Sequence, residues 1–410
     1  MRVATHQSSR GRRLADAGDK GDKNGGGHAD ATRLIHPRGG DAPLSRTVGP
    51  AIQRGSTVLM SCAADLYDYN QVTYGRQGLA AQGALQQALC ELEGAEGCEI
   101  YPSGLAALTA ALLAVLKAGD EILVVDTIYA PTRRFCDRML GRFGVKVGYY
   151  PPRLPADEIL ALGGPKLRLI VLESPGSLTL EMQDAPAIAR AAKAHGVLTL
   201  MDNTWGAGLL FKPLAHGIDL SVQALTKYVC GTSDVFMGSV SARDPKLLRA
   251  LTDGILHLGW AVSADEAYQA LRGLRTLPVR LARHGESALT IARWLTQQPE
   301  VTEVIHPALP TSLDHALWAR DYSGSCGLFS LLLRPAPESA VNAFLDGLKL
   351  FGLGFSWGGF ESLAVSSGDQ LLQRRHRPKL AGPLVRLHIG LEAPEDLIAD
   401  LRSGLDAFAA

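Results

Sequence analysis

The chain has 410 residues, which is longer than one typical domain and long enough for two. Hydrophobic residues make up 46% of the chain and charged residues 20%, a balance that supports a large buried core. Lysine plus arginine equals aspartate plus glutamate, at 41 each, so the basic surplus of a general nucleic-acid binder is missing and we expect no nucleic-acid partner.

Residues 1–30 are rich in glycine, aspartate, lysine and arginine, and they lack the continuous apolar stretch of a secretory signal. A segment of this composition buries little apolar surface, so we expect a disordered extension. Residues 31–80 are irregular and loop-rich, and they predict an N-terminal arm. The longest apolar run, residues 105–116, is too short to span a bilayer, which argues against a membrane protein.

Helical and extended patterns alternate over residues 81–265. Apolar residues at helical spacing predict helices over residues 85–95, 103–119, 131–144 and 185–196. Runs of valine, isoleucine and leucine predict buried strands over residues 121–126, 146–150, 167–176 (ending in a turn), 197–203 and 220–227. Strands that are apolar on both faces and alternate with helices indicate an α/β domain with a mostly parallel sheet.

Residues 266–410 have a different pattern. A long helical stretch covers residues 265–298, and strands are predicted near residues 327–333 and 384–389. This mixture predicts a second, smaller α+β domain at the C-terminal end.

The six cysteines are scattered through the chain, at positions 62, 90, 98, 136, 230 and 326. They form no C-x-x-C motif, and none has zinc spacing with a histidine, so we expect no metal site. Reduced thiols of this kind are typical of the cytoplasm, which is the location we expect.

Three polar features fall where a sheet of this class binds ligands, at the carboxyl ends of its strands. Ser103 and Gly104 open a helix, whose first turn suits a phosphate; Asp202 ends a strand; Lys227 ends the following apolar run. Each has an ordinary alternative: a helix cap, a turn carboxylate, and a lysine whose ammonium group reaches solvent.

The combination is more specific than its parts, because it matches one cofactor, pyridoxal 5'-phosphate. In that interpretation Lys227 bonds covalently to the cofactor, Asp202 keeps the pyridine nitrogen protonated, and the helix start holds the phosphate. Tyr129, just past the strand over residues 121–126, would stack on the ring. An ordinary loop tyrosine is the alternative there.

Longer stretches extend the match over residues 31–408. They are TYGRQG (73–78), YPSGLAAL (101–108), DNTW (202–205), QALTKY (223–228), GLRTLPVRL (273–281), HPALP (306–310), SGSCGLFS (323–330), FSWGGFES (355–362) and RLHIGLE (386–392). The chain resembles the Cys/Met-metabolism family of pyridoxal-phosphate-dependent enzymes. The resemblance implies an aspartate-aminotransferase-like fold (fold type I).

The resemblance also implies cofactor contacts. Lys227 would hold the cofactor and move the substrate Cα proton, Asp202 would pair with the pyridine nitrogen, and Tyr129 would stack on the ring and assist proton movement. The phosphate would be held by the backbone at Gly104 and Leu105, with the hydroxyl of Thr226.

Contacts to an amino-acid substrate and to a neighbouring subunit follow in the same way. Arg386 would clamp the substrate carboxylate, with Ser356 and Trp357 bordering it. Tyr74 and Arg76 would reach the phosphate of a neighbouring subunit. The resemblance therefore implies a homo-oligomer with shared active sites, of which a tetramer built as a dimer of dimers is the family's usual form.

Two positions favour the β-lyase branch of the family. Ala224 stands three residues before the lysine, where many γ-enzymes have serine, and Trp357 is typical of β-lyases. Three positions depart from the pattern: Thr232 replaces a usual histidine, and Phe355 and Phe360 replace common tyrosines. Each removes a polar group near the site, and we expect altered substrate tolerance.

The implied reaction is β-elimination of L-cystathionine to homocysteine, pyruvate and ammonia, a step of methionine synthesis. Cysteine, cystine and other S-conjugates are further candidate substrates. The alternatives are γ-lyase or γ-synthase activity, a general cysteine desulfhydrase, and a non-catalytic binding module. The last is disfavoured because Lys227, Asp202 and Arg386 are all present.

Overall fold

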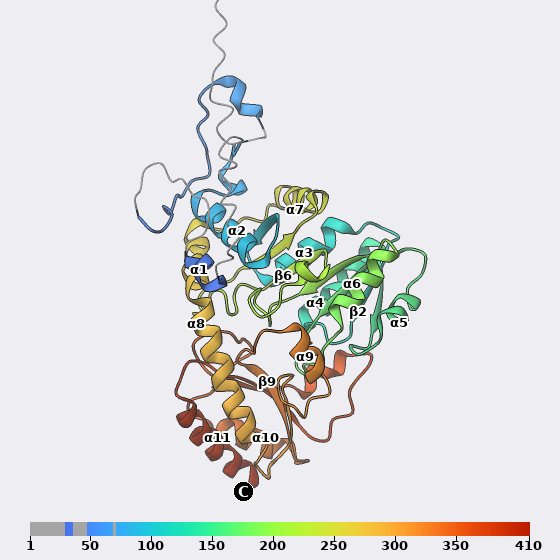
Figure 1. Cartoon of the computed structure of the whole chain (residues 1–410), viewed down its shortest axis with the longest axis vertical. Coiled ribbons are helices and arrows are strands. Elements are labelled where there is room, and N and C mark those ends of the chain that lie inside the picture. Colours follow the sequence, from blue (N-terminus) through green and yellow to red (C-terminus); the bar gives the residue numbers. More distant parts are fainter. Residues whose placement is uncertain (1–28, 36–46, 69–70) are drawn as a thin grey trace, which may run out of the picture.

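The computed structural model describes residues 29–35, 47–68 and 71–410. The predicted extension over residues 1–30 lies outside this range except for its last two residues. A short helix, α1 (Asp30–Ile35), and two 3-10 turns (Ala63–Tyr67 and Gly75–Gln77) belong to the predicted arm. Part of the arm projects away from the rest of the molecule, and two sheets lie one above the other below it (Figure 1).

The larger sheet has seven strands. They are β1 (Gly97–Tyr101), β2 (Glu121–Val125), β3 (Lys146–Tyr150), β4 (Leu167–Glu173), β5 (Leu198–Asp202), β6 (Leu220–Gln223) and β7 (Gly238–Ala242). Their order is β1-β7-β6-β5-β4-β2-β3. β7 is antiparallel to both of its neighbours, and the other neighbouring pairs in this sheet are parallel, so the predicted mostly parallel sheet is confirmed.

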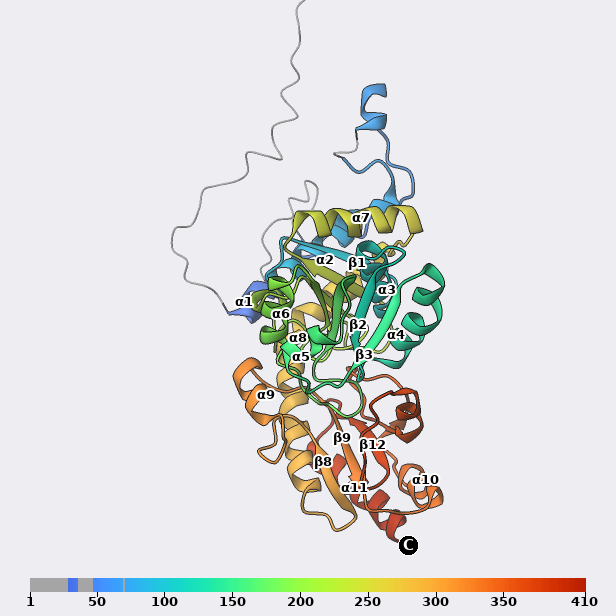
Figure 2. The same ribbon diagram turned by 90° about the vertical axis from the view of Figure 1, so that its right-hand side faces the viewer.

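Helices cover both faces of this sheet. They are α2 (Ala80–Glu93), α3 (Gly104–Val115), α4 (Ala130–Phe135), α5 (Ala156–Ala161), α6 (Ala185–Ala194) and α7 (Pro245–Leu258). Figure 2 shows α3 and α4 on one side of the sheet and α5 and α6 on the other. Such two-sided cover explains why the strands are apolar on both faces.

Two predicted helices differ in detail. Ser103 caps α3, accepting the N–H of Ala106 at 3.1 Å, but α3 ends at Val115 rather than at residue 119. The predicted helix over residues 131–144 begins as α4 and continues as a π-helical turn (Cys136–Leu140) and a 3-10 turn. It stops at Gly144, whose φ of +76° is left-handed and ends the helix.

The strand predicted over residues 220–227 is shorter than expected. β6 ends at Gln223, because the N–H of Ala224 bonds to the hydroxyl of Thr204 at 2.9 Å instead of to a neighbouring strand. The N–H of Lys227 then bonds to the carbonyl of Ala224 at 3.0 Å. Lys227 therefore lies in a turn beyond the strand and not at the strand's last residue.

The smaller sheet comes from the C-terminal part of the chain. Its strands are β8 (Val301–Ile305), β9 (Leu328–Leu333), β10 (Gly352–Leu353), β11 (Leu363–Ser366) and β12 (Leu384–His388), in the order β10-β11-β12-β9-β8. Its helices are α9 (His315–Asp321), α10 (Glu338–Asp346) and α11 (Pro394–Ala409). The expected smaller α+β part is therefore present.

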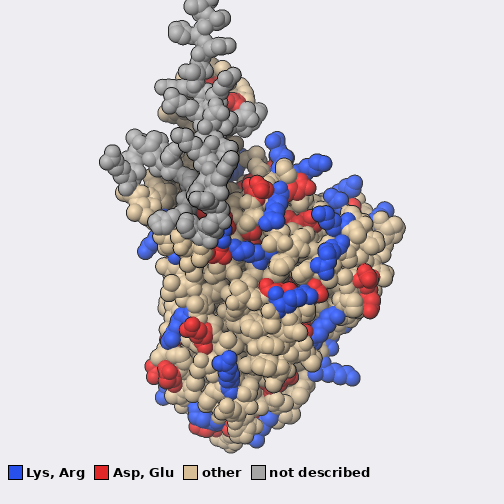
Figure 3. Space-filling model, viewed as in Figure 1, with Lys and Arg blue, Asp and Glu red and all other residues tan. Residues whose placement is uncertain are grey.

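A 32-residue helix, α8 (Ala264–Leu295), connects the two sheets, packing on α2 at one end and on α11 at the other (Figure 1). The predicted domain boundary at residue 265 falls in its first turn and stays a prediction. No helix among the described residues is long and apolar enough to cross a membrane. On the face drawn in Figure 3, basic and acidic side chains are interspersed.

Candidate active site

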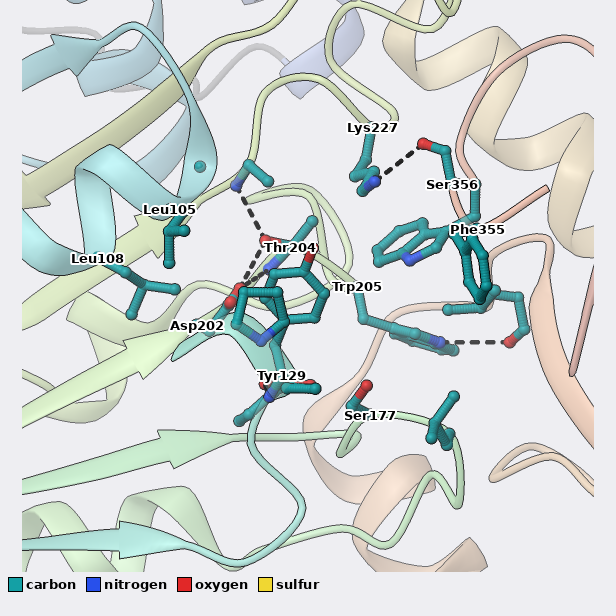
Figure 4. Close-up of a pocket in the computed structure, with 18 of the residues that line it drawn as sticks. Leu105, Leu108, Tyr129, Ser177, Asp202, Thr204, Trp205, Lys227, Phe355 and Ser356 are labelled. Atoms are coloured by element: carbon teal, nitrogen blue, oxygen red, sulfur yellow. Dashed lines mark hydrogen bonds between the residues drawn. The ribbon is translucent and has the colours of Figure 1, made fainter. Parts of the chain in front are cut away.

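A cavity of about 570 Å³ lies where the strands of the larger sheet end and loops of the smaller sheet approach them (Figure 4). It brings together residues that are up to 283 positions apart in the chain, from Ser103 to Arg386. Of the eleven residues to which the resemblance assigns a cofactor or substrate contact, nine line it: Gly104, Leu105, Tyr129, Asp202, Thr226, Lys227, Ser356, Trp357 and Arg386.

Lys227 is half-buried, and its Nζ atom donates a hydrogen bond to the Ser356 hydroxyl at 2.9 Å (Figure 4). The ammonium group also lies 5.4 Å from the centre of the Trp357 ring. Burial lowers the pKa of Lys227 to about 8, with a further decrease from the positive charge of Arg386. Near neutral pH a useful fraction of this amine is therefore uncharged and nucleophilic.

Asp202 is the last residue of β5, and its carboxylate is buried. Its Oδ1 atom accepts two bonds from Thr204, one from the backbone N–H at 3.0 Å and one from the hydroxyl at 2.5 Å. Burial raises the pKa of Asp202, since a dry site penalises the charged form. A cationic N–H in the cavity would relieve that penalty, which fits a protonated pyridine nitrogen.

The first turn of α3 forms one wall of the cavity. The N–H groups of Gly104 and Leu105 have no partner within the helix, because a helix leaves its first N–H groups unpaired. A Cβ atom at Gly104 would lie 2.4 Å from the Cβ of Ala224, so only glycine lets the helix approach the turn that leads to Thr226. This helix start fits a phosphate.

The hydroxyl of Thr226 is already engaged. It donates to the carbonyl of Met237 at 3.1 Å and accepts the N–H of the same residue at 3.0 Å. A hydrogen bond from Thr226 to a phosphate would have to replace the bond to the Met237 carbonyl. The predicted phosphate contact of Thr226 therefore stays a prediction.

Arg386 is on β12, 8% exposed, and donates from Nη2 to the carbonyls of Phe355 at 2.7 Å and Ser356 at 3.3 Å. Within the described ranges no carboxylate forms an ion pair with it. Burial lowers the pKa of Arg386 to about 10. A buried guanidinium that lacks an acid partner suits a carboxylate brought by a substrate.

Tyr129 follows β2, precedes α4 and is 46% exposed. Its backbone N–H donates to the Oε2 atom of Glu173 at 2.7 Å, which fixes the start of α4 at the cavity. Tyr129 lines the cavity together with Asp202. Its stacking role is not tested by this geometry.

Sequence reasoning missed Glu173, which lines the same cavity. It is the last residue of β4 and pairs in register with Asp202 on β5. Burial, and next the neighbouring Asp202, raise the pKa of Glu173 well above its usual range. An acid at the end of a predicted strand, beside another such strand, was the signal that could have found it.

Gln370 and Gln373 were also missed, and no local signal marks them. They belong to a 3-10 segment (Gly368–Gln373) that reaches the cavity from the smaller sheet. Asp126 anchors the residues that follow, because its carboxylate accepts the N–H groups of Arg375 at 3.0 Å and His376 at 2.7 Å.

The structure does not bring Tyr74 and Arg76 to this cavity. They line a separate hollow beside Arg54 and Asp265, with the Arg76 guanidinium 5.2 Å from the centre of the Tyr74 ring. Of the three departures from the family pattern, Phe355 lines the cavity. Thr232 and Phe360 are not among the lining residues. Across the described part of the chain, no group of three or more His, Cys, Asp or Glu side chains could hold a metal ion.

The chain is similar to known proteins over most of its length. Residues 31–406 match the family described as Cys/Met metabolism PLP-dependent enzyme. The chain is 42% identical to the cystathionine beta-lyase of Salmonella typhimurium (91% of this chain, 97% of that one) and 42% identical to that of Bordetella avium (92% and 95%).

A solved structure resembles it too. The cystathionine gamma synthase of Xanthomonas oryzae pv. oryzae is 34% identical and superposes with a TM-score of 0.86, covering 93% of this chain and 99% of that one. The fold type and the pyridoxal phosphate dependence expected from the sequence are thereby confirmed. The chain belongs to the Cys/Met metabolism family of PLP-dependent enzymes.

Proposed function

We propose that this protein is a carbon–sulfur lyase that cleaves L-cystathionine by β-elimination, releasing homocysteine, pyruvate and ammonia. The observation that carries the proposal is 42% identity to two cystathionine β-lyases over more than 90% of the chain, against 34% to a γ-synthase. Ala224 and Trp357, which favour the β-lyase branch, both line the cavity.

Bound pyridoxal phosphate would supply an aldehyde that condenses with amino groups and a protonated ring that withdraws electrons from the substrate Cα. The residues that would hold it are Lys227, Asp202, Tyr129 and the start of α3. Asp202 would keep the pyridine nitrogen protonated, and the N–H groups of Gly104 and Leu105 would bind the phosphate.

Residues of the chain would then orient the substrate and remove its Cα proton. Arg386 would orient the substrate through its carboxylate. Lys227, with its lowered pKa, would take the Cα proton, and its bond to Ser356 would aim the amine. Loss of a thiolate from Cβ completes the elimination, and the remaining three-carbon fragment hydrolyses to pyruvate and ammonia.

The hollow at Tyr74 and Arg76 supports a shared site. Both residues are exposed in the isolated chain and lie apart from its own cavity. We propose that they complete the phosphate site of a neighbouring subunit in a homo-oligomer, with a tetramer as the expected form, and that the enzyme works in the cytoplasm.

A γ-lyase or γ-synthase is the alternative, because those enzymes would use the same cofactor contacts. The decisive experiment identifies the keto acid that the purified, cofactor-loaded protein releases from L-cystathionine. We expect pyruvate with homocysteine. Release of 2-oxobutyrate with cysteine would move the enzyme to the γ-lyase type, and release of neither would mean that cystathionine is not its substrate. The Lys227→Ala variant, loaded in the same way, is the matched control.

A further inference from the structure

The loop over residues 355–359 forms the roof of the cavity at Lys227. Side chains of β12 form hydrogen bonds with the backbone of this loop. Arg386 and His388 are two residues apart on β12, so their side chains leave the same face of the strand. Arg386 donates to the loop carbonyls described above. His388 is 1% exposed, and its Nε2 atom lies 3.0 Å from the backbone nitrogen of Gly358.

The loop leaves little room for displacement. Gly358 has a φ of +87°, and a Cβ atom there would lie 2.8 Å from the Cα of Lys227. The two residues before it present the Ser356 hydroxyl and the Trp357 ring to Lys227. A shift of Gly358 would therefore move both partners of the lysine ammonium group.

The protonation of His388 can be read from its surroundings. Burial, and next the positive charge of neighbouring groups, lower the pKa of His388 to about 3, so the ring is neutral. Its Nε2 atom also lies 3.1 Å from the Gly359 carbonyl. One neutral nitrogen cannot both accept from Gly358 and donate to Gly359. The tautomer of His388 therefore determines which of the two hydrogen bonds forms.

The Gly358 N–H and the neighbouring ring of His284 on α8 together favour one tautomer. The Nδ1 atom of His284 lies 2.8 Å from the Ile389 carbonyl, which only accepts, so Nδ1 carries the proton and Nε2 is bare. The two ring centres are 5.3 Å apart, and of the four nitrogens in these two rings His284 Nε2 and His388 Nδ1 are the ones without a hydrogen-bond partner. With Nδ1 protonated on His388, its Nε2 atom is bare and accepts the buried Gly358 N–H. The other tautomer would leave that N–H without an acceptor and would place two bare nitrogens in neighbouring rings.

We propose that His388 is a positioning residue: its bare Nε2 accepts the Gly358 N–H and thereby fixes Ser356 and Trp357 against Lys227. The kinetic part of this inference rests on the proposed lyase function. The positioning itself is a property of the cofactor-loaded protein without substrate.

The test compares His388→Phe, which fills the space but cannot accept, with His388→Gln, whose side-chain oxygen reaches the position of Nε2. We expect His388→Phe to lower kcat about tenfold, the size of one unpaired buried donor, and to change KM less than about twofold, because Arg386 is intact. His388→Gln should stay within about threefold of wild type. Should the phenylalanine variant fail to fold, His388→Asn, whose amide is too short to reach Gly358, takes its place.

A second measurement needs no turnover. The visible absorbance of the bound cofactor is titrated with pH in each variant, since its midpoint responds to what surrounds the nitrogen of Lys227. A midpoint that moves in His388→Phe and returns in His388→Gln supports the proposal. Midpoints and kcat that match wild type in both variants, or that change equally in both, overturn it. If wild type releases no keto acid from cystathionine, the proposed function fails, and the absorbance titration still decides the role of His388.

Discussion

The floor and the roof of the cavity are held in different ways. The floor belongs to the larger sheet, and its residues are placed by backbone pairing: Asp202 is the last residue of β5, in register with Glu173 on β4. The roof belongs to the smaller sheet, and its loop is held by hydrogen bonds between side chains and backbone groups. Arg386 donates to two loop carbonyls, and His388 accepts one loop N–H. The proposed cofactor contacts thus depend on the fold itself, whereas the proposed substrate contacts depend on a few side-chain bonds.

The strongest test of the floor is Lys227→Ala. Removing the amine takes away both the attachment point for the cofactor and the group proposed to move the Cα proton, so turnover of L-cystathionine should fall by roughly a thousandfold or more. The visible absorbance of the lysine-bound cofactor should also disappear. Normal turnover by this variant would contradict the assignment of the site.

Arg386→Ala tests the roof. We expect KM to rise roughly 10- to 100-fold, because a charged hydrogen-bonding partner of the substrate carboxylate is lost, while the absorbance band of the lysine-bound cofactor is retained. Steady-state kinetics and a spectrum of the same preparation are sufficient. Arg249→Ala, which removes an exposed arginine of α7, is the control. An unchanged KM would place the carboxylate clamp elsewhere.

Arg76→Ala tests whether one chain alone supplies all the residues that bind the cofactor phosphate. If Arg76 reaches the phosphate of a neighbouring subunit, the variant should bind pyridoxal phosphate about tenfold more weakly, which dialysis followed by a cofactor assay would measure. Tyr74→Phe should weaken binding in the same direction by losing one hydrogen bond. Full retention of cofactor by both variants on dilution would argue against a shared site.

Glu93→Gln should have the smallest effect on activity, since Glu93 lies at the end of α2, contacts β6 and does not line the cavity. Its buried carboxyl accepts bonds from Ser221 at 3.1 Å and from Gln223, both on β6, and burial raises its pKa to about 7. The folded protein therefore holds this proton while the unfolded chain releases it near pH 4.5, so stability falls as pH rises from about 4.5 to 7, by about 3 kcal/mol.

Glutamine mimics the protonated form and should remove that loss. The melting temperature of Glu93→Gln relative to wild type should therefore increase between pH 5 and pH 8, with kcat unchanged. A difference that is constant across this pH range would mean that Glu93 is ionised in the folded protein.

Local patterns were sufficient for much of the floor. Apolar runs identified β2, β3, β4 and β5, and Ser103 was identified as the cap of α3. β1 and β7 were missed, because GCEIY and GSVSA contain small or polar residues in place of an apolar run. They are strands because β1 pairs with β7 and β7 pairs with β6, which are long-range contacts that no short window contains.

The roof was less predictable, for the same reason. The resemblance to a family pointed to Ser356, Trp357 and Arg386, but nothing local in the sequence did. Gln370 reaches the cavity because the segment after it is anchored on Asp126, about 250 residues earlier in the chain. The turn that carries Lys227 was mistaken for a strand, since its residues are as apolar as those of β6.

The close approach of Gly358 to Lys227 also constrains motion. At this point the backbones of floor and roof are already in contact, so the smaller sheet cannot move closer to the larger one there. A relative movement of the two parts that keeps this contact would rotate about it, as about a pivot. Opening for substrate entry would then widen the rim formed by Phe355 and the 368–373 segment, while the lysine and its serine partner, close to the pivot, would move least.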